Sequence, residues 1–282
     1  MQFKSTKKAV IDYTVTIPHI SFPALSEYPF IIHGFSTRFG GVSSGFFSTM
    51  NLGYDSGPIA DNPNDVKENF RRIASSIGFD PKTIVISKQV HKTNVRYVDQ
   101  NDCGKGLFRP RDFDEVDGFI TNVPNVTLVT KYADCVPLYF VDPVKKAIGL
   151  SHSGWRGTVQ KIGYVTVKEM QSKFGTDPKD IVSVIGPSIC KNCFEIGEEV
   201  AEEFRKAFNN WEEERLLSTN ENGKYQCDLW AANRLVLLEA GLTEEHIHIS
   251  GVCTSCYSDL LFSHRKTGGK RGSLAAFLAL KE

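Results

Sequence analysis

The sequence predicts an α+β fold with mixed β-sheets, and two observations carry this prediction. Segments rich in β-branched residues and segments with helical spacing are mixed along the chain, without the strict alternation of a doubly wound fold. In addition, the 282 residues contain no clear repeat, no low-complexity segment and no long Pro/Ser linker. A chain of this length forms one large domain or two modest ones. We therefore expect one compact domain over residues 1–282.

Eight short segments have the alternation and β-branched content of strands. They are residues 83–87, 95–99, 118–121, 126–130, 138–142, 147–151, 181–186 and 246–251. Helical spacing is found in residues 64–77, 158–174 and 198–208, and in a segment that begins after Asp228 and stops at Gly241. The first of these helices follows an asparagine cap and a proline, and Asp228 is a good N-cap for the last.

Composition excludes several classes of function. The 33 Lys+Arg residues balance 33 Asp+Glu residues, which argues against a general binder of nucleic acid or of anionic membranes. No apolar run reaches the length of a membrane span, and the N-terminal segment lacks a signal-peptide core. We therefore expect a cytoplasmic protein, in which the seven cysteines are reduced thiols or metal ligands. Neutral charge and this length fit a monomer and a homodimer equally.

Five connections are too rich in Gly, His, Cys and Arg to be simple turns, and catalytic groups are often found on such loops. They are residues 33–53, 88–91, 132–137, 151–158 and 262–272. In residues 151–158, Gly154 and Gly157 would let a ligand approach the backbone, and Arg156 adds a donor for an anion. A phosphate-binding turn and an ordinary strand–helix turn both fit this pattern, and the last segment fits an anion-binding flap or a solvated basic loop.

The cysteines allow two kinds of metal site. Cys135 would be a nucleophile, a metal ligand or a buried core residue, and no ligand-spacing rule joins it to His91 or His152, although a Cys and two His suit zinc. A rival reading uses the two CxxC pairs, each just beyond a predicted strand, as a closed zinc site of four thiolates. These pairs are Cys190 with Cys193 and Cys253 with Cys256. A redox pair and simple burial are the alternatives.

Eight motifs spread in order over about residues 31–273 closely resemble the YfiH/YlmD family of bacterial proteins. They are HGFSTRFGGVS, NLGYDSGPIADNPNDVKENFRR, QVH, EVDGFIT, ADCVPLYFVD, IGLSHSGWRGTV, IGPSICKNCFEIG and FSHRKTGGKRG. The pair ADCVP and HSGWRGT at this spacing is highly specific. The family's last motif usually reads closer to FSYRRD. His264 and Lys266 depart from it, which puts the role of that loop in doubt.

The resemblance implies a layered α/β/β/α domain, with residues 1 to about 25 as an N-terminal extension. It implies a catalytic zinc held by His91, Cys135 and His152. The implied activity is that of a purine nucleoside phosphorylase, which converts adenosine, inosine or methylthioadenosine and phosphate to the base and ribose-1-phosphate, with adenosine deaminase activity in addition. The preferred nucleoside is not decided by the sequence.

Four further residues are candidates for roles in this chemistry. Arg156 would contact phosphate, as would Arg38 and Arg265, because guanidinium groups bind anions in bidentate fashion. Asp134, next to Cys135, would shuttle protons in the deamination.

Two other activities compete. Copper-dependent oxidation of phenols is the family's older label, but seven histidines are few for a multicopper oxidase, although copper could bind at the same trio. A cysteine hydrolase would use Cys135 as nucleophile and His152 as base. Zinc on the thiolate would argue against the hydrolase.

Overall fold

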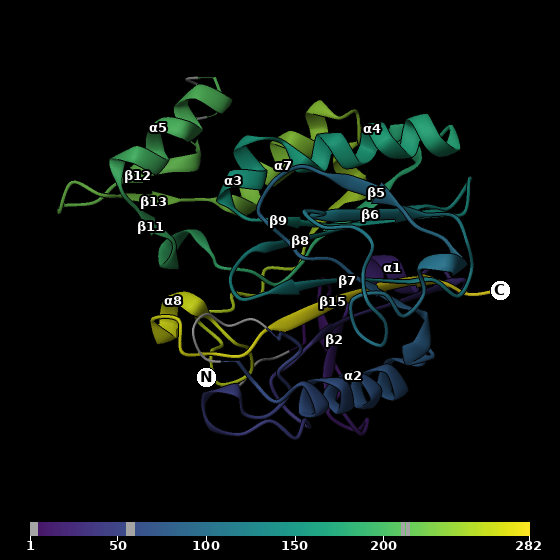
Figure 1. The fold of residues 1–282 in the computed structure, drawn as a ribbon. Coiled ribbons are helices and arrows are strands. Elements are labelled where there is room, and N and C mark those ends of the chain that lie inside the picture. Colours follow the sequence, from purple (N-terminus) through teal and green to yellow (C-terminus); the bar gives the residue numbers. More distant parts are fainter. Residues whose placement is uncertain (1–4, 55–59, 210–211, 213–214) are drawn as a thin grey trace.

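Two six-stranded sheets lie face to face, and helices cover the outer face of each (Figure 1). The computed structural model describes residues 5–54, 60–209, 212 and 215–282. The first sheet has the order β1-β2-β3-β15-β7-β4, and the second has the order β14-β10-β8-β9-β6-β5. Helix α2 lies below the first sheet, whereas α3, α4 and α7 lie above the second. The predicted α+β class and the α/β/β/α layering are confirmed.

The strands of the first sheet are β1 (Val10–Ile11), β2 (His19–Ser21), β3 (Ile31–Ser36), β4 (Ile84–Ile86), β7 (Thr127–Tyr132) and β15 (Leu274–Leu280). Those of the second are β5 (Val95–Tyr97), β6 (Gly118–Thr121), β8 (Val136–Asp142), β9 (Ala147–Ser153), β10 (Val182–Ile185) and β14 (Ile247–Ile249). A small third sheet holds β11 (Glu195–Ile196), β12 (Leu217–Thr219) and β13 (Tyr225–Cys227). The pairs β4–β7, β5–β6 and β10–β14 are parallel and occur beside antiparallel pairs, so both large sheets are mixed. All eight predicted strands are present; β6 has the predicted bounds, and the other seven differ at one or both ends.

The helices are α1 (Pro23–Ser26), α2 (Pro63–Ile77), α3 (Trp155–Val159), α4 (Ile162–Phe174), α5 (Glu198–Ala207), α7 (Leu229–Glu239) and α8 (His264–Thr267). The Asn62 side chain caps α2 and that of Asp228 caps α7, as the sequence predicts. The prediction of one helix over residues 158–174 is wrong. Lys161 has a left-handed backbone with φ of 60°, which separates α3 from α4.

Apolar side chains fill the space between the two sheets and between each sheet and its helices. The core between the sheets includes Phe35 and Leu128 from the first sheet and Tyr139 and Leu150 from the second. On the other face of the first sheet, Phe70 of α2 packs edge-on against Phe277, with ring centroids 6.3 Å apart. Each such fully buried side chain stabilises the fold by roughly 1.5–3 kcal/mol. The two sheets thus form a rigid support for the loops at their ends.

The segment predicted as an N-terminal extension is part of the fold, because β1 and β2 add an edge to the first sheet. The first four residues of that segment lie outside the described residues, as do residues 55–59 within the NLGYDSGPIADNPNDVKENFRR motif. Among the helices that the structure describes, we find none that combines the length and the apolar character needed to cross a membrane.

Candidate active site

His91, Cys135 and His152 meet at one end of the second sheet. One potential ligand atom from each lies within 4.8 Å of the others, and Cys135 Sγ is 3.9 Å from Nε2 of His91. His152 belongs to β9, and Cys135 directly precedes β8. Because β8 and β9 pair with Pro137 opposite His152, the thiol comes beside the imidazole. His91 comes from the loop after β4. Sheet pairing therefore assembles a trio that residue spacing alone could not.

The buried carboxylate of Asp117 holds both histidines in place. Its Oδ1 lies 2.9 Å from Nδ1 of His152 and accepts a hydrogen bond from the backbone N–H of His91 at 2.9 Å. Its Oδ2 accepts from the backbone N–H groups of Val90 and Lys92. With Nδ1 engaged in this way, Nε2 of His152 is left for the centre of the trio.

Asp117 was missed as a site residue in the sequence, although it lies within the EVDGFIT motif. The signal was a carboxylate directly before an apolar strand, and such a group is buried only when it is well paired. Burial by itself would raise the pKa of the Asp117 carboxyl, but the hydrogen bond and charge of His152 and the backbone donors lower it.

The Cys135 thiol and the His152 imidazole shift each other's pKa. Burial by itself would raise the pKa of Cys135, but the two neighbouring histidines lower it to about 6. Burial would likewise lower the pKa of His152, but Cys135 and Asp117 raise it to about 9. At neutral pH the pair is therefore a thiolate next to an imidazolium, and the thiolate is the form that binds metals.

Backbone conformation around the trio is unusual. His91 and Asp134 both have left-handed backbones, with φ of 62° and 87°. A left-handed non-glycine residue costs about 1–3 kcal/mol, and such residues cluster at functional sites. A Cβ at Gly154 would lie 2.8 Å from Cδ2 of His91 and 3.1 Å from Sγ of Cys135. Glycine at this position therefore makes room for the two candidate ligands themselves, in addition to any approaching substrate.

The trio opens on a cavity of about 570 Å³ that is strongly cationic. The cations that line it are Lys88, Lys131, Arg156, Arg265 and Arg271, with His264 beside them. Aromatic side chains of Tyr132, Trp155 and Phe194 complete the wall. Asp134 is the acidic residue among the described lining residues. The cavity is thus suited to a ligand that combines an anion with a flat ring.

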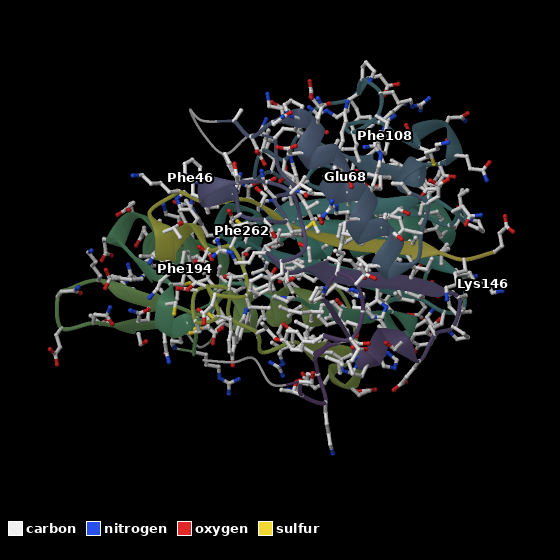
Figure 2. All side chains as sticks on the ribbon, turned by 90° about the horizontal axis from the view of Figure 1, so that it is seen from below. Phe46, Glu68, Phe108, Lys146, Phe194 and Phe262 are labelled. Atoms are coloured by element: carbon white, nitrogen blue, oxygen red, sulfur yellow. The ribbon has the colours of Figure 1, made fainter. Side chains whose placement is uncertain are left out.

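Arg156 and Arg265, two of the three arginines predicted to contact phosphate, both line this cavity. The Arg156 guanidinium lies over the Trp155 ring, 4.2 Å from its centroid. The Arg265 guanidinium lies 5.4 Å from the centroid of Phe194, which stands where the small sheet meets α8 (Figure 2). Arg271, from the same basic segment, also lines the cavity and donates to the Ser273 hydroxyl and the Gly272 carbonyl. Three guanidinium groups therefore converge on one space.

Asp134 lies in the wall with both carboxylate oxygens engaged. Oδ1 accepts from the Thr254 hydroxyl at 2.6 Å, and Oδ2 accepts from the backbone N–H of Arg265 at 2.7 Å. The Asp134 carboxylate thereby ties α8, which begins at His264, to the segment that carries Cys135. This geometry favours a holding role for Asp134 over proton transfer.

Arg38 is not brought together with the other candidates. It is absent from the described residues that line the cavity. Its guanidinium donates to the carbonyl oxygens of Ser48 and Ser258 and lies 4.8 Å from the centroid of the Phe262 ring. The side chain therefore connects loops that are distant in the sequence.

The donor set fits zinc. Imidazole nitrogen and thiolate sulfur are ligands that zinc prefers, and sites with three protein ligands keep a further position for water or substrate. The engaged Nδ1 of His152 supplies the outer hydrogen bond that metal-ligating histidines almost always have.

Comparison with known proteins shows the family to which this chain belongs. Residues 32–281 match the model of a family described as multi-copper polyphenol oxidoreductase laccase. The chain belongs to this family. The predicted resemblance is confirmed, because YlmD proteins are found among the sequence relatives, and YlmD and YfiH proteins are found among the similar solved structures.

Three relatives illustrate the match. Purine nucleoside phosphorylase YlmD of Bacillus subtilis is 39% identical over 258 residues, which cover 89% of each chain. Adenosine deaminase RL5, from an unknown prokaryotic organism, is 36% identical over 207 residues, 71% of this chain and 76% of that one. The crystal structure of YlmD from Geobacillus stearothermophilus superposes with a TM-score of 0.89 at 34% identity, covering 98% of this chain and all of that one.

Proposed function

We propose that the protein is a zinc-dependent purine nucleoside phosphorylase that acts on adenosine, inosine or methylthioadenosine and also deaminates adenosine. One observation carries the proposal: the three zinc-type donors open on the same cavity as three guanidinium groups and the Trp155 and Phe194 rings. The names of the relatives support it, since they include purine nucleoside phosphorylases and an adenosine deaminase. A cytoplasmic location, a single domain and a monomeric or homodimeric state stay predictions.

The chain's own side chains would bind the two substrates side by side. Arg156, Arg265 and Arg271 would hold phosphate through charge-assisted hydrogen bonds, and the purine would stack on Trp155 or Phe194. A phosphate oxygen would then attack the anomeric carbon as the bond to the purine breaks. Holding the two reactants in contact removes much of the entropic cost of a bimolecular step.

The cationic wall would also stabilise the charge that moves during the reaction. Negative charge leaves the attacking phosphate and develops on the departing purine, and fixed cations in a cavity stabilise it without reorganisation. Bound zinc would supply Lewis-acid chemistry, polarising the base or activating water for the deamination. Asp134 would fix α8, and with it Arg265, at the wall.

The proposal is tested by incubating adenosine with the zinc-loaded protein, with and without phosphate, and separating the products by chromatography. Adenine and ribose-1-phosphate formed only with phosphate would support the phosphorylase, and inosine formed without phosphate would support the deaminase. A Cys135→Ala sample should form none of these products. If stoichiometric zinc is present and adenosine is left intact, the purine proposal fails.

A cysteine hydrolase is a second candidate, because Cys135, His152 and Asp117 stand in the order of a nucleophile, a base and an orienting carboxylate. Zinc on Cys135 would occupy the thiolate. If the protein is a cysteine hydrolase, its hydrolytic activity should therefore persist after zinc is removed by a chelator.

The family's description supports a third candidate, copper-dependent oxidation of phenols. Among the described residues, the candidate metal groups are this trio and a cluster of four cysteines. Neither resembles the histidine-rich cluster of a multicopper oxidase. A phenol-oxidation assay with copper-loaded and zinc-loaded protein tests this candidate directly.

A further inference from the structure

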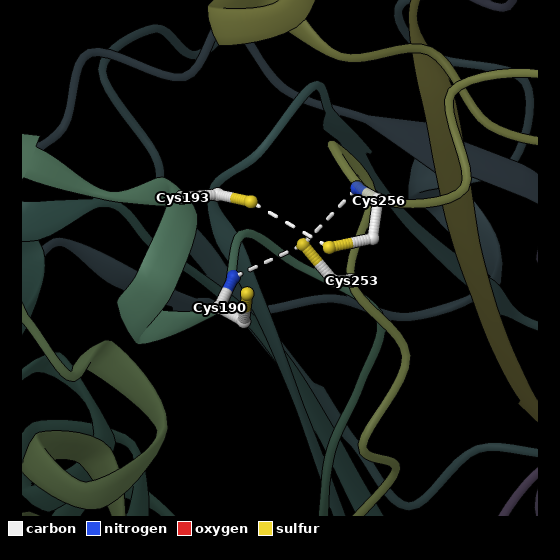
Figure 3. A group of neighbouring side chains, drawn as sticks. All are labelled: Cys190, Cys193, Cys253 and Cys256. Atoms are coloured by element: carbon white, nitrogen blue, oxygen red, sulfur yellow. Dashed lines mark hydrogen bonds between the residues drawn. The ribbon is translucent and has the colours of Figure 1, made fainter.

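Two loops that are far apart in the sequence bring four cysteines together (Figure 3). Strands β10 and β14 are neighbours and run parallel, so the loops that follow them leave the same edge of the second sheet. Cys190 and Cys193 lie on the first loop, and Cys253 and Cys256 lie on the second. Ser188 and Cys253 form a parallel bridge that extends this pairing beyond the strands. The topology therefore brings the two CxxC pairs close together, although they are far apart in the sequence.

The four sulfur atoms converge on one point. All lie within 4.8 Å of one another, and those of Cys193 and Cys256 are 3.5 Å apart. In a tetrahedral zinc thiolate with Zn–S bonds of about 2.3 Å, the sulfurs would be about 3.8 Å apart. Two backbone N–H groups point at one sulfur, since those of Cys190 and Cys256 donate to Sγ of Cys253 at 3.3 and 3.4 Å. Such donors stabilise the negative charge of a thiolate.

We propose that Cys190, Cys193, Cys253 and Cys256 form a closed structural site for one zinc ion, separate from the trio at the cavity. Two CxxC pairs presented by two loops are the arrangement that structural zinc sites use. Zinc binding forms four Zn–S bonds and releases the thiol protons to water, with no change of oxidation state. Because all four ligands come from the protein, this site keeps no position for substrate.

The site would brace one wall of the cavity. Ile189, next to Cys190, donates its N–H to the carbonyl of Asp134 at 3.0 Å, and Thr254, next to Cys253, donates its hydroxyl to the Asp134 carboxylate. Phe194, next to Cys193, lines the cavity itself.

The same bracing extends to α8. Nη1 of Arg265 donates to the carbonyl of Cys193 at 3.3 Å. Zinc at the four cysteines would therefore fix both loops against the residues that flank Cys135, and its effect on the reaction would be through positioning.

The experiment uses a Cys135→Ala variant, which removes a ligand of the trio and leaves the four-cysteine cluster intact. We expect this variant to retain about one zinc per chain. X-ray absorption at the zinc edge should give a shell of sulfur alone at about 2.3 Å. A variant purified without zinc, or a shell that contains nitrogen or oxygen, would overturn the proposal.

Further substitutions in this background test the ligands one at a time. Cys256 is exposed, so Cys256→Ser should lose the remaining zinc without opening a cavity in the core. Cys256→His should retain zinc, because imidazole is also a zinc ligand. Cys103 lies outside both candidate metal groups, so Cys103→Ser should retain as much zinc as the Cys135→Ala variant in which it is made. Zinc retained in Cys256→Ser would contradict the proposal.

A count of thiols separates the zinc site from disulfides. After chelation and denaturation without reductant, every cysteine that remains in the Cys135→Ala variant should react with a thiol reagent. A shortfall of two or four thiols would show that the pairs are disulfides and would overturn the proposal. This result does not depend on the reaction proposed above, because no nucleoside is used.

Discussion

Oδ1 of Asp117 lies 2.9 Å from Nδ1 of His152, and this contact fixes which imidazole nitrogen faces Cys135. The same carboxylate accepts hydrogen bonds from the backbone N–H groups of Val90, His91 and Lys92. Asp117 therefore orients two of the three candidate ligands. Outer partners of this kind set the affinity of a metal site as well as its geometry.

Substitution of Asp117 should therefore weaken zinc binding. We expect Asp117→Asn to lower zinc affinity about 10- to 100-fold, since an amide is a weaker acceptor and carries no charge. Competition with a chromogenic chelator measures this affinity. The control is Glu115→Gln, two residues away, where the exposed carboxylate pairs with Lys92. Equal zinc affinity in Asp117→Asn and the unchanged protein would show that this carboxylate has no such role.

Gly154 should be more sensitive to a methyl group than Gly157. In Gly154→Ala, the new Cβ would push against His91 and Cys135, so zinc affinity and activity should both fall. In Gly157→Ala, the nearest atom is 3.5 Å away, and the helical position favours alanine. We expect this control to keep its zinc. The same chelator competition compares the two variants, and a similar loss in both would argue against crowding at the trio.

Substitutions of Arg156 and Arg38 should differ in their effect on the KM for phosphate. Arg156→Ala should raise the KM for phosphate about ten- to a hundredfold, which corresponds to one hydrogen bond between charged groups. Arg38→Ala should leave this KM unchanged and lower the free energy of unfolding by about 1–3 kcal/mol, because it removes donors to the Ser48 and Ser258 carbonyls. Initial rates at varied phosphate and urea unfolding measure the two effects. A raised KM for phosphate in Arg38→Ala would contradict this prediction and indicate that Arg38 contacts phosphate.

Reactivity of Cys135 should depend on pH in a characteristic way. Its pKa of about 6 in the metal-free fold lies below the ordinary value of 9.0, so the thiolate persists above pH 6 and is lost as the pH falls through that value. Alkylation by iodoacetamide, followed by mass spectrometry, should be half-maximal near pH 6 in the folded protein and near pH 9 after unfolding.

An internal control for this titration is available in the same digest. Burial raises the pKa of Cys103, so its peptide should react only at higher pH. Zinc should protect Cys135 throughout the range. Alkylation of Cys135 that follows the pH dependence of Cys103 would contradict the thiolate–imidazolium pair.

Local pattern in the sequence was sufficient for much of the fold. Short segments rich in β-branched residues, such as VSVI in β10, indicate strands by themselves. The helix caps at Asn62 and Asp228 are likewise local side-chain interactions. Strand β15 was missed because LAAFLAL is apolar throughout, and a short run of this kind does not distinguish a buried strand from a helix. The break at Lys161 was missed because a left-handed lysine has no sequence signal.

The candidate site depends on tertiary contacts that local sequence patterns do not reveal. His91, Cys135 and His152 were named through the resemblance, because only the pairing of β8 with β9 and the hydrogen bonds of Asp117 bring them together. Arg38 and Arg156 look alike in sequence, each near glycines in a loop. Their environments separate them, since one guanidinium binds backbone carbonyls and the other faces the cavity. The contact between the CxxC pairs likewise required the parallel neighbours β10 and β14.

The most direct test of the account is the recovery of phosphate-dependent adenosine cleavage when zinc is returned to chelated protein. We predict that activity is lost on chelation and returns with zinc, and that Cys135→Ala stays inactive at every zinc concentration. Cleavage that survives complete removal of zinc, or that persists in Cys135→Ala, would contradict the assignment of the reaction to the trio of His91, Cys135 and His152.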